Sequence, residues 1–426
     1  MNNKCSFFYI FAGRLRRRAD INYQVKRLII IADGMADRHI GKLGGHTPLQ
    51  HACTPCMDLL ARKGRCGMLI TVPDGLTPGS DVAITSILGY DAAAVGEGRG
   101  PIEAAGMGYE IAEGDLALRC NLITIRNGII TSHNGDGITT AESQPLIRLL
   151  SDQLDNERVH FMAGSSHSHL LVVKQGERQV VCTPPHDLIG QPWREFAPVP
   201  DLFDGGMTTA MLLRTLIVCS QQVLAHRSTA NSIWPWSGGH RLLLPPLRSR
   251  WPQLQSGAVV TATSLVRGIA RYAGLHCIDV PGATGRPDTN YEAKAQAAID
   301  ALRHNDLVLL HVEAPDEASH CGDLPLKLQT IEDIDARLLH PICEALSRLS
   351  EPMVVALLPD HPTPVELRTH TAAPVPFLIY YNGIVPDAVD RFDESACAAG
   401  AYGLLQPQEF MPLLMGVTTS ATPTTY

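Results

Sequence analysis

Three short segments in the C-terminal half of the chain carry aspartates and histidines in the pattern of a metal site. They contain Asp316 with His320, Asp360 with His361, and His370. Carboxylate oxygens and imidazole nitrogens bind divalent manganese or zinc, and two adjacent ions stabilise both the attacking and the leaving oxygen of an in-line displacement. These residue types therefore predict metal-dependent phosphoryl transfer.

Two segments near the N-terminus complete this set. Asp33 follows the apolar run 28–32, and Ser80 follows a loop rich in Pro and Gly, at the start of a predicted helix. Free backbone N–H groups at a helix start favour phosphate, and a serine hydroxyl beside divalent ions is a strong nucleophile. We assign one ion to Asp316, His320 and His370, and the other to Asp33, Ser80, Asp360 and His361.

The acidic segments follow apolar runs, which places them at the ends of buried strands. The runs 308–312 and 354–358 precede Asp316 and Asp360, as 28–32 precedes Asp33. Parallel strands present functional groups at their carboxyl ends. Strand and helix patterns alternate from residue 264 to 358, so we predict an α/β sheet with helices on both faces.

Length and composition indicate two domains. A chain of 426 residues with 45% apolar content exceeds one ordinary core. After Tyr90 the sequence becomes rich in glycine, and short alternating segments then continue to about residue 255. We predict a discontinuous metal-binding domain over residues 27–94 and 256–410, and an inserted smaller α+β domain over residues 95–255. Residues 1–26 are predicted to be a disordered extension, and residues 411–426 a tail.

Charge and composition restrict the partners. A net charge of −8 gives no general attraction to nucleic acid, which favours a small-molecule substrate. With the phosphoryl transfer predicted above, we expect a small phosphorylated metabolite. The chain has no 18-residue apolar span, so no membrane partner is expected. Eleven cysteines lack the spacing of a disulfide framework, which favours the cytoplasm. The oligomeric state stays open.

Several motifs stand in a fixed order between about residues 27 and 410. They read ADGM from Ala32, PGSD from Pro78, ILGYD from Ile87, GRGP from Gly98, RCN from Arg119, DEASH from Asp316 and DHPTP from Asp360. The series resembles the cofactor-independent phosphoglycerate mutases of the archaeal type, within the alkaline phosphatase superfamily. NSIWPW from Asn231 and GAYGLL from Gly400 resemble a bacterial branch proposed to act as homoserine kinase.

The resemblance implies an alkaline-phosphatase-like sheet that holds two divalent metals, commonly manganese, with zinc, magnesium or cobalt as alternatives. It also implies an inserted domain that closes over the substrate. Ser80 would take the phosphoryl group from 3-phosphoglycerate, and the reoriented glycerate would take it back on its 2-hydroxyl. The reaction would be an isomerisation that needs no 2,3-bisphosphoglycerate.

Such a substrate needs cationic groups and a general base. Arg99 and Arg119 can bind carboxylate or phosphate with two parallel hydrogen bonds, and Lys294 can neutralise charge on the transferring phosphoryl group. Three residues of the inserted segment are candidates for substrate binding and for the general base, and the sequence does not choose among them. They are His133, Asp136 and His169.

The inserted segment departs from the family pattern at two places. His167 and Ser168 stand where relatives carry a tyrosine and an arginine, and the stretch 133–138 replaces a Ser-Ala-Gly motif followed by a basic residue. The loss of an arginine bears on substrate identity. Three alternatives therefore stay open: a homoserine-kinase-like phosphotransferase of threonine biosynthesis, a metal-dependent phosphomonoesterase, and a non-catalytic metabolite-binding protein.

Overall fold

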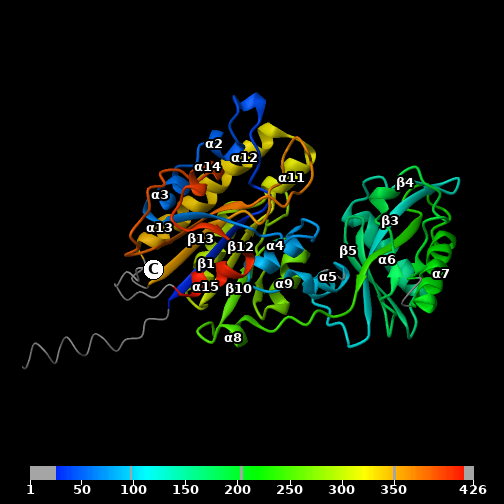
Figure 1. Cartoon of the computed structure of the whole chain (residues 1–426). Helices are drawn as coiled ribbons and strands as arrows, with labels where there is room; N and C mark the ends of the chain where they lie inside the picture. Colours follow the sequence, from blue (N-terminus) through cyan, green and yellow to red (C-terminus); the bar gives the residue numbers. More distant parts are fainter. Residues whose placement is uncertain (1–24, 96–97, 202–204, 349–351, 417–426) are drawn as a thin grey trace, which may run out of the picture.

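The computed structural model describes residues 25–95, 98–201, 205–348 and 352–416. It contains a large sheet with helices on both faces and a smaller sheet with helices of its own (Figure 1). This architecture confirms the predicted fold class. The predicted disordered extension, apart from its last two residues, lies outside the described part of the chain.

The large sheet has eight strands in the order β11-β10-β12-β1-β13-β14-β2-β15. The five strands from β11 to β13 are parallel to one another, and β14 is antiparallel to both β13 and β2. Their bounds are Lys26–Ala32 (β1), Arg65–Leu69 (β2), Gly257–Val260 (β10), His276–Ile278 (β11), Leu307–Val312 (β12), Met353–Leu358 (β13), Val375–Tyr381 (β14) and Gly403–Leu405 (β15).

The central strands are buried on both faces, as their continuous apolar runs predict. Leu28 and Ile30 of β1 enter the core on one face, while Ile29 and Ile31 enter the core on the other, because successive side chains of a strand alternate. The first face is covered by α3 (Pro55–Lys63), α10 (Tyr291–Leu302), α12 (Leu324–Asp333) and α13 (His340–Arg348), and the second by α4 (Ser80–Ile87), α9 (Ser264–Tyr272) and α15 (Phe410–Gly416).

The C-terminal tail begins later than predicted. Helix α15 runs to Gly416, and Met411, Leu414 and Met415 are buried in the core between this helix and the large sheet. The prediction that the tail starts at residue 411 is therefore wrong. The Thr-rich sequence from residue 417 onward lies outside the described residues.

The smaller sheet has the order β4-β3-β6-β5, and β9 pairs in addition with residues 117–123 of β3. The strand pairings within it are antiparallel. Its elements are β3 (Leu116–Arg126), β4 (Ile129–Ser132), β5 (Val159–Ser165), β6 (Ser168–Val173) and β9 (Ser232–Gly239), with α6 (Thr140–Leu154) and α7 (Met207–Val223) packed against it.

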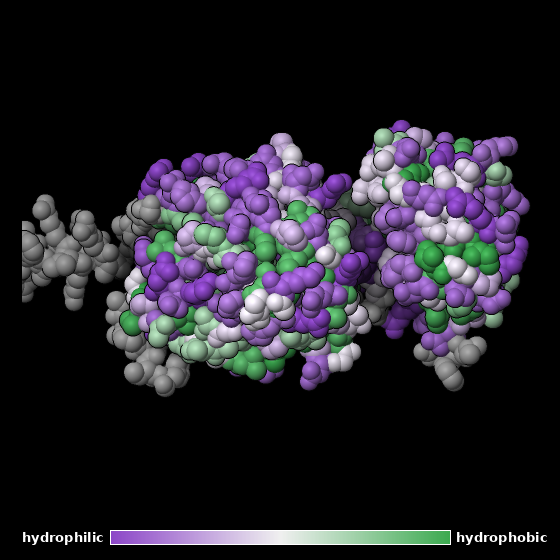
Figure 2. Space-filling view, turned by 90° about the horizontal axis from the view of Figure 1, so that it is seen from above, coloured by the Kyte–Doolittle hydropathy of each residue, from purple (hydrophilic) through white to green (hydrophobic). Residues whose placement is uncertain are grey.

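The two sheets lie in separate parts of the molecule, each with its own apolar core (Figure 1). The space-filling view shows a furrow between the two parts and a predominantly hydrophilic surface on both (Figure 2). The segment that returns from β9 to β10 packs on the large sheet, with Leu247 and Leu254 buried in its core. The division into domains stays a prediction, but this packing places the end of the smaller unit nearer residue 239 than 255.

None of the helices in the described part of the chain combines the length and the apolar content that a membrane crossing requires.

Candidate active site

The predicted metal ligands meet at the carboxyl ends of three adjacent parallel strands, β12, β1 and β13. Asp33 directly follows β1, and Asp360 lies two residues after β13. Asp316 lies in the first turn of α11 (Ala314–Cys321), which follows β12. The strand order therefore brings together carboxylates that are about three hundred residues apart in the sequence.

Ser80 lies among the first group of ligands. Its Oγ is 3.2 Å from His361 Nε2 and donates a hydrogen bond to Asp33 Oδ2 at 3.4 Å. The same His361 nitrogen lies 3.7 Å from Asp33 Oδ1 and 3.4 Å from Asp360 Oδ2. Because Ser80 is also the first residue of α4, its hydroxyl stands where a helix N-terminus favours an anion.

A second group surrounds Asp316. His320 Nε2 lies 3.2 Å from Asp316 Oδ2, and His370 Nε2 lies 3.4 Å from Asp316 Oδ1. Two sets of ligand atoms are close enough to hold an ion, Asp33 with Asp360 and His361, and Asp316 with His361 and His370. His361 thus belongs to both sets, which the predicted assignment of separate ligands did not foresee.

The two outer histidines are oriented by backbone carbonyls. His320 Nδ1 is 3.0 Å from the carbonyl oxygen of Arg368, and His370 Nδ1 is 3.3 Å from that of Pro78. Donation from Nδ1 leaves the Nε2 lone pair of each ring toward the site, where the two Nε2 atoms are 2.9 Å apart. Two lone pairs at that distance repel each other unless a proton or a cation lies between them.

Gly34 allows the carboxylates to come together. Its φ is +63°, and an added Cβ would lie 2.5 Å from Asp316 Oδ1. Its backbone N–H donates to Asp360 Oδ1 at 3.2 Å. A side chain at this position would be strained in the backbone and would displace a predicted ligand.

The electrostatics of the site fit cations. Burial, together with the nearby charges of Asp360 and Asp316, raises the pKa of Asp33 well above its usual range. Burial also raises the pKa of Glu313 to about 8. Among the described residues, Asp33 Oδ1 and Asp360 Oδ2 are buried without a hydrogen-bond partner. Buried carboxylates in this number require a compensating positive charge, which divalent metals would supply.

The sequence analysis missed His311. This residue lies inside β12, and its Nε2 is 3.0 Å from Asp33 Oδ2 while its Nδ1 is 3.1 Å from Thr261 Oγ1. Burial lowers its pKa to about 4, so the ring is neutral and holds Asp33 from behind. The sequence feature that could have identified His311 is the presence of an ionisable residue within an otherwise apolar strand.

Thr363 was also missed. Its hydroxyl donates to Asp316 Oδ1 at 2.6 Å and lies 3.2 Å from His361 Nδ1. It thereby links the two metal groups through one side chain. Asp316 is additionally hydrogen-bonded by His320 and His370, and these contacts outweigh burial and hold its pKa well below the usual range.

Of the two predicted arginines, Arg99 is bonded to the residue next to Ser80, and Arg119 lies near Arg99. The guanidinium of Arg99 donates two bonds to Asp81, at 3.0 and 3.2 Å, and Asp81 directly follows Ser80. Arg119 of β3 faces α5 (Gly100–Gly106), where its Nε is 3.2 Å from Glu103 Oε1. Charge on Arg99 lowers the pKa of Arg119 after the larger effect of burial, because the two cations are near each other.

Arg119 belongs to a cluster of rings on the smaller sheet. Its guanidinium carbon lies 4.5 Å from the ring centre of Trp236, which makes an edge contact with His186 at 5.5 Å between centroids. His133 lies 6.0 Å from His167 and 6.3 Å from His186. Arg119 also donates to Ser168 Oγ at 3.2 Å, so both positions that depart from the family pattern lie in this cluster.

Three of the predicted site residues lie neither among the metal ligands nor in the ring cluster. Lys294 is fully buried behind the metal site, where its Nζ donates to the backbone carbonyl of His311 at 3.2 Å. Asp136 forms an ion pair with Arg126 at 2.8 Å. His169 follows Ser168 in β6 and therefore points to the opposite face, where its Nδ1 accepts a bond from a backbone N–H.

Comparison with known proteins agrees with this geometry. Residues 61–229 match the family described as 2,3-bisphosphoglycerate-independent phosphoglycerate mutase. A protein of that name from Methanosarcina barkeri is 42% identical over 399 residues, which cover 92% of this chain and 99% of the relative. A probable mutase of the same kind from Geobacter sulfurreducens is 40% identical, over 88% of this chain and 96% of the relative.

Solved structures show the same fold. A Pyrococcus horikoshii protein aligns with a TM-score of 0.78 at 29% identity, over 92% of this chain and 97% of that one. The cofactor-independent phosphoglycerate mutase of Thermoplasma acidophilum aligns with a TM-score of 0.64 at 27% identity, over 92% and 99%. The chain described here belongs to the family of 2,3-bisphosphoglycerate-independent phosphoglycerate mutases.

Proposed function

We propose that this protein is an isomerase that interconverts 3-phosphoglycerate and 2-phosphoglycerate through a phosphoserine at Ser80, without 2,3-bisphosphoglycerate. The observation that carries the proposal is the position of the Ser80 hydroxyl, 3.2 Å from His361 Nε2 and at the start of α4, in a chain of this family. The proposal assigns the protein to glycolysis and gluconeogenesis. The free thiols of the described cysteines support a cytoplasmic location.

We further propose two manganese ions as the resident metals. Asp33, Ser80, Asp360 and His361 would hold one, and Asp316, His320 and His370 the other. His361 is assigned to the first ion alone, because its Nδ1 faces Thr363 and only the Nε2 lone pair is free. When bound, such ions lower the pKa of a nearby hydroxyl and stabilise charge on a transferring phosphoryl group. The unpaired oxygens of Asp33 and Asp360 support this assignment.

In the first step, the Ser80 oxygen attacks phosphorus, and the bond from phosphorus to the C3 oxygen of the substrate breaks. The hydroxyl proton of Ser80 is lost, and the released C3 oxygen gains a proton. The free backbone N–H groups in the first turn of α4 stabilise the phosphoryl oxygens. Arg99 uses two of its five N–H bonds on Asp81, so the remaining ones are available to the substrate.

In the second step, the 2-hydroxyl of glycerate attacks the phosphoserine and the Ser80 oxygen leaves. This step needs a base for the 2-hydroxyl proton and a cation for the substrate carboxylate. We assign the base to His133, because burial lowers its pKa and leaves the ring neutral, and the carboxylate to Arg119 in the same cluster. The contacts of Asp136 and His169 give less support to their predicted roles.

Lys294 supports the site from behind. Its amine is bonded to the carbonyl of His311, and it is also close enough to Glu313 for that carboxylate to raise its pKa against the larger effect of burial. We assign it to positioning His311, and through it Asp33, in place of the predicted contact with the phosphoryl group.

Phosphorus NMR of 3-phosphoglycerate with the manganese-loaded protein tests the proposal. We expect a 2-phosphoglycerate signal with the native chain and none with Ser80→Ala. Ser86→Ala, on the same helix, is the matched control and should keep the activity. Release of inorganic phosphate alone would indicate a phosphomonoesterase, and product that appears only with homoserine and a phosphoryl donor would indicate the kinase.

A further inference from the structure

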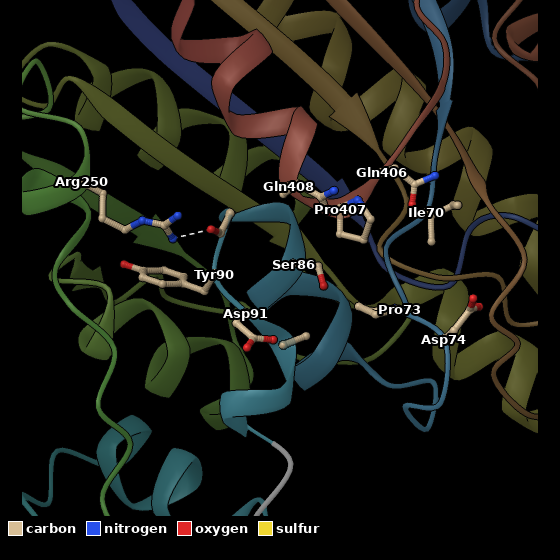
Figure 3. A pocket seen from close by; sticks show the side chains of 12 residues that line it. Ile70, Pro73, Asp74, Ser86, Tyr90, Asp91, Arg250, Gln406, Pro407 and Gln408 are labelled. Carbon is tan, nitrogen blue, oxygen red and sulfur yellow. Dashed lines mark hydrogen bonds between the residues drawn. The ribbon is translucent and has the colours of Figure 1, made fainter.

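A pocket of about 470 Å³ lies at the far end of α4 from Ser80 (Figure 3). Ser86 is in its wall, six residues after Ser80, which corresponds to roughly 9 Å along a helix. None of the residues that line it is a metal ligand or one of the arginines of the active site. The lining residues used below are Asp74, Ser86, Tyr90, Asp91, Arg250 and Gln406.

The Ser86 hydroxyl indicates a missing ligand. Ser86 is only 1% exposed, and its Oγ has no hydrogen-bond partner. Figure 3 shows this hydroxyl directed toward the pocket. A buried hydroxyl without a partner is unfavourable, and a ligand that bonds to it would recover this loss.

The charge around the pocket favours a cation. Asp74 and Asp91 both line it and are exposed. The one cation of the lining, Arg250, is occupied, because it donates to the carbonyl of Gly89 and lies 5.1 Å over the ring of Tyr90. The C-terminal end of α4, with its negative partial charge, points to the same region.

The pocket also lies where the two parts of the molecule are connected. The segment that leads from α4 toward the smaller sheet begins with Gly89 and Tyr90, and the segment 240–256 returns from it to β10. Tyr90 donates its hydroxyl proton to the carbonyl of Pro245 at 2.7 Å, and Arg250 donates to Gly89. The two connections therefore contact each other beside the pocket.

We propose that this pocket binds a small organic cation with a primary ammonium group, and that the bound cation restrains the two connections between the sheets. The ammonium group would donate to Ser86 Oγ, while Asp74 and Asp91, which line opposite sides of the pocket, would attract its charge, and the amide of Gln406 would face the rest of the ligand. This site is independent of the proposed reaction, so it can be tested whatever the substrate is.

A set of four-carbon probes tests the charge preference. Calorimetric titration of the full-length, manganese-loaded protein would compare 1,4-diaminobutane, 1,4-butanediol and succinate. We expect binding of the diamine alone. Absence of diamine binding, or equal binding of the diol or succinate, would overturn the proposal.

Variants test the location. Asp74→Asn with Asp91→Asn should weaken diamine binding at least tenfold, and Ser86→Ala should weaken it several-fold. Asp300→Asn is the matched control, because Asp300 is an exposed aspartate that pairs with Arg303 on α10. Diamine affinity that is unchanged in the double variant, or reduced equally in the control, would show that the pocket is not the site.

Hydrogen exchange tests the restraint. The diamine should slow amide exchange in residues 89–92 and 245–250 of the native protein, and not in the Asp74→Asn, Asp91→Asn variant. Binding that leaves exchange in both segments unchanged would refute the restraint of the connections.

Discussion

The metal site on the large sheet and the ring cluster on the smaller sheet are built in different ways. The carboxylates of the metal site follow adjacent parallel strands, and Asp33, Asp360 and His361 are at most 2% exposed. The ring cluster takes His133 from a loop and His186 from a single helical turn, Pro185–Leu188, and its residues touch through ring edges and through the guanidinium of Arg119.

Under the proposed function, this difference separates the residues that carry out phosphoryl transfer from those that recognise the substrate. A ligand at the end of a buried strand is positioned by the register of the whole sheet, so a change there disturbs several neighbours. A partly exposed ring on a loop can be replaced at little cost to the fold. The two departures from the family pattern, at residues 133–138 and at His167 with Ser168, both fall in or beside the ring cluster.

Asp33→Asn should have the largest effect of the changes considered. Because the amide is a poor ligand for divalent ions, we expect mutase activity to fall at least about a thousandfold, with metal content reduced. The metal-free variant should be more stable than the metal-free native protein, because burial and nearby carboxylates raise the pKa of Asp33 and make its charge unfavourable. Activity assays, metal analysis and thermal unfolding measure these effects. Equal stability of the two metal-free proteins would contradict the electrostatic explanation.

Metal removal should change stability next most strongly. Manganese at one hundred times its Kd stabilises a protein by about 2.7 kcal/mol if it binds only the folded state. Chelator-treated protein should therefore show a lower Tm, which added manganese restores. The Arg119→Met variant should show the same decrease in Tm on metal removal as the native chain, since Arg119 lies in the ring cluster on the smaller sheet. A smaller shift in that variant would mean that the two regions are coupled.

Arg119→Met should raise the KM for 3-phosphoglycerate by roughly ten- to a hundredfold, as expected for the loss of a charged hydrogen bond to a substrate carboxylate. The metal content should stay unchanged. Arg126→Met is the matched control, because Arg126 lies on the same strand in an exposed pair with Asp136, and it should change KM by less than about twofold. Equal effects of the two substitutions would argue against Arg119 as the ligand of the substrate carboxylate and would favour the predicted role of Asp136 in substrate binding.

Lys294→Met should have the smallest effect, visible in the pH dependence of stability. Burial lowers the pKa of Lys294 from 10.5 to about 8, so between these values the unfolded chain binds more protons than the folded one. Native stability should rise between pH 8 and 10 with a slope of up to about 1.4 kcal/mol per pH unit, and the variant should lack this contribution. Urea unfolding of the metal-free native protein and of the variant at several pH values measures this contribution. Equal changes of the unfolding free energy with pH in the two proteins would refute the prediction.

Predictions from the sequence were most accurate where a residue directly follows a recognisable strand. Asp33 and Asp360 were placed correctly because apolar runs end just before them, and the alternation of strands and helices predicted from residue 264 begins at α9, Ser264–Tyr272. His311 was missed because it lies inside such a run and was counted as part of it. Lys294 was predicted to neutralise charge on the phosphoryl group, and its charge gave no sign of complete burial.

The sequence alone therefore determined the residue types of the site, the class of chemistry and the alternation of strands and helices, since these depend on local patterns. Only the tertiary structure decided which strands are neighbours, that His361 lies between two ligand groups, and that Asp136 pairs with Arg126. It also created the pocket beside Ser86, whose walls come from four separate segments. The physical reason is that local patterns fix the direction and the face of a side chain, whereas its neighbours depend on pairing between distant parts of the chain.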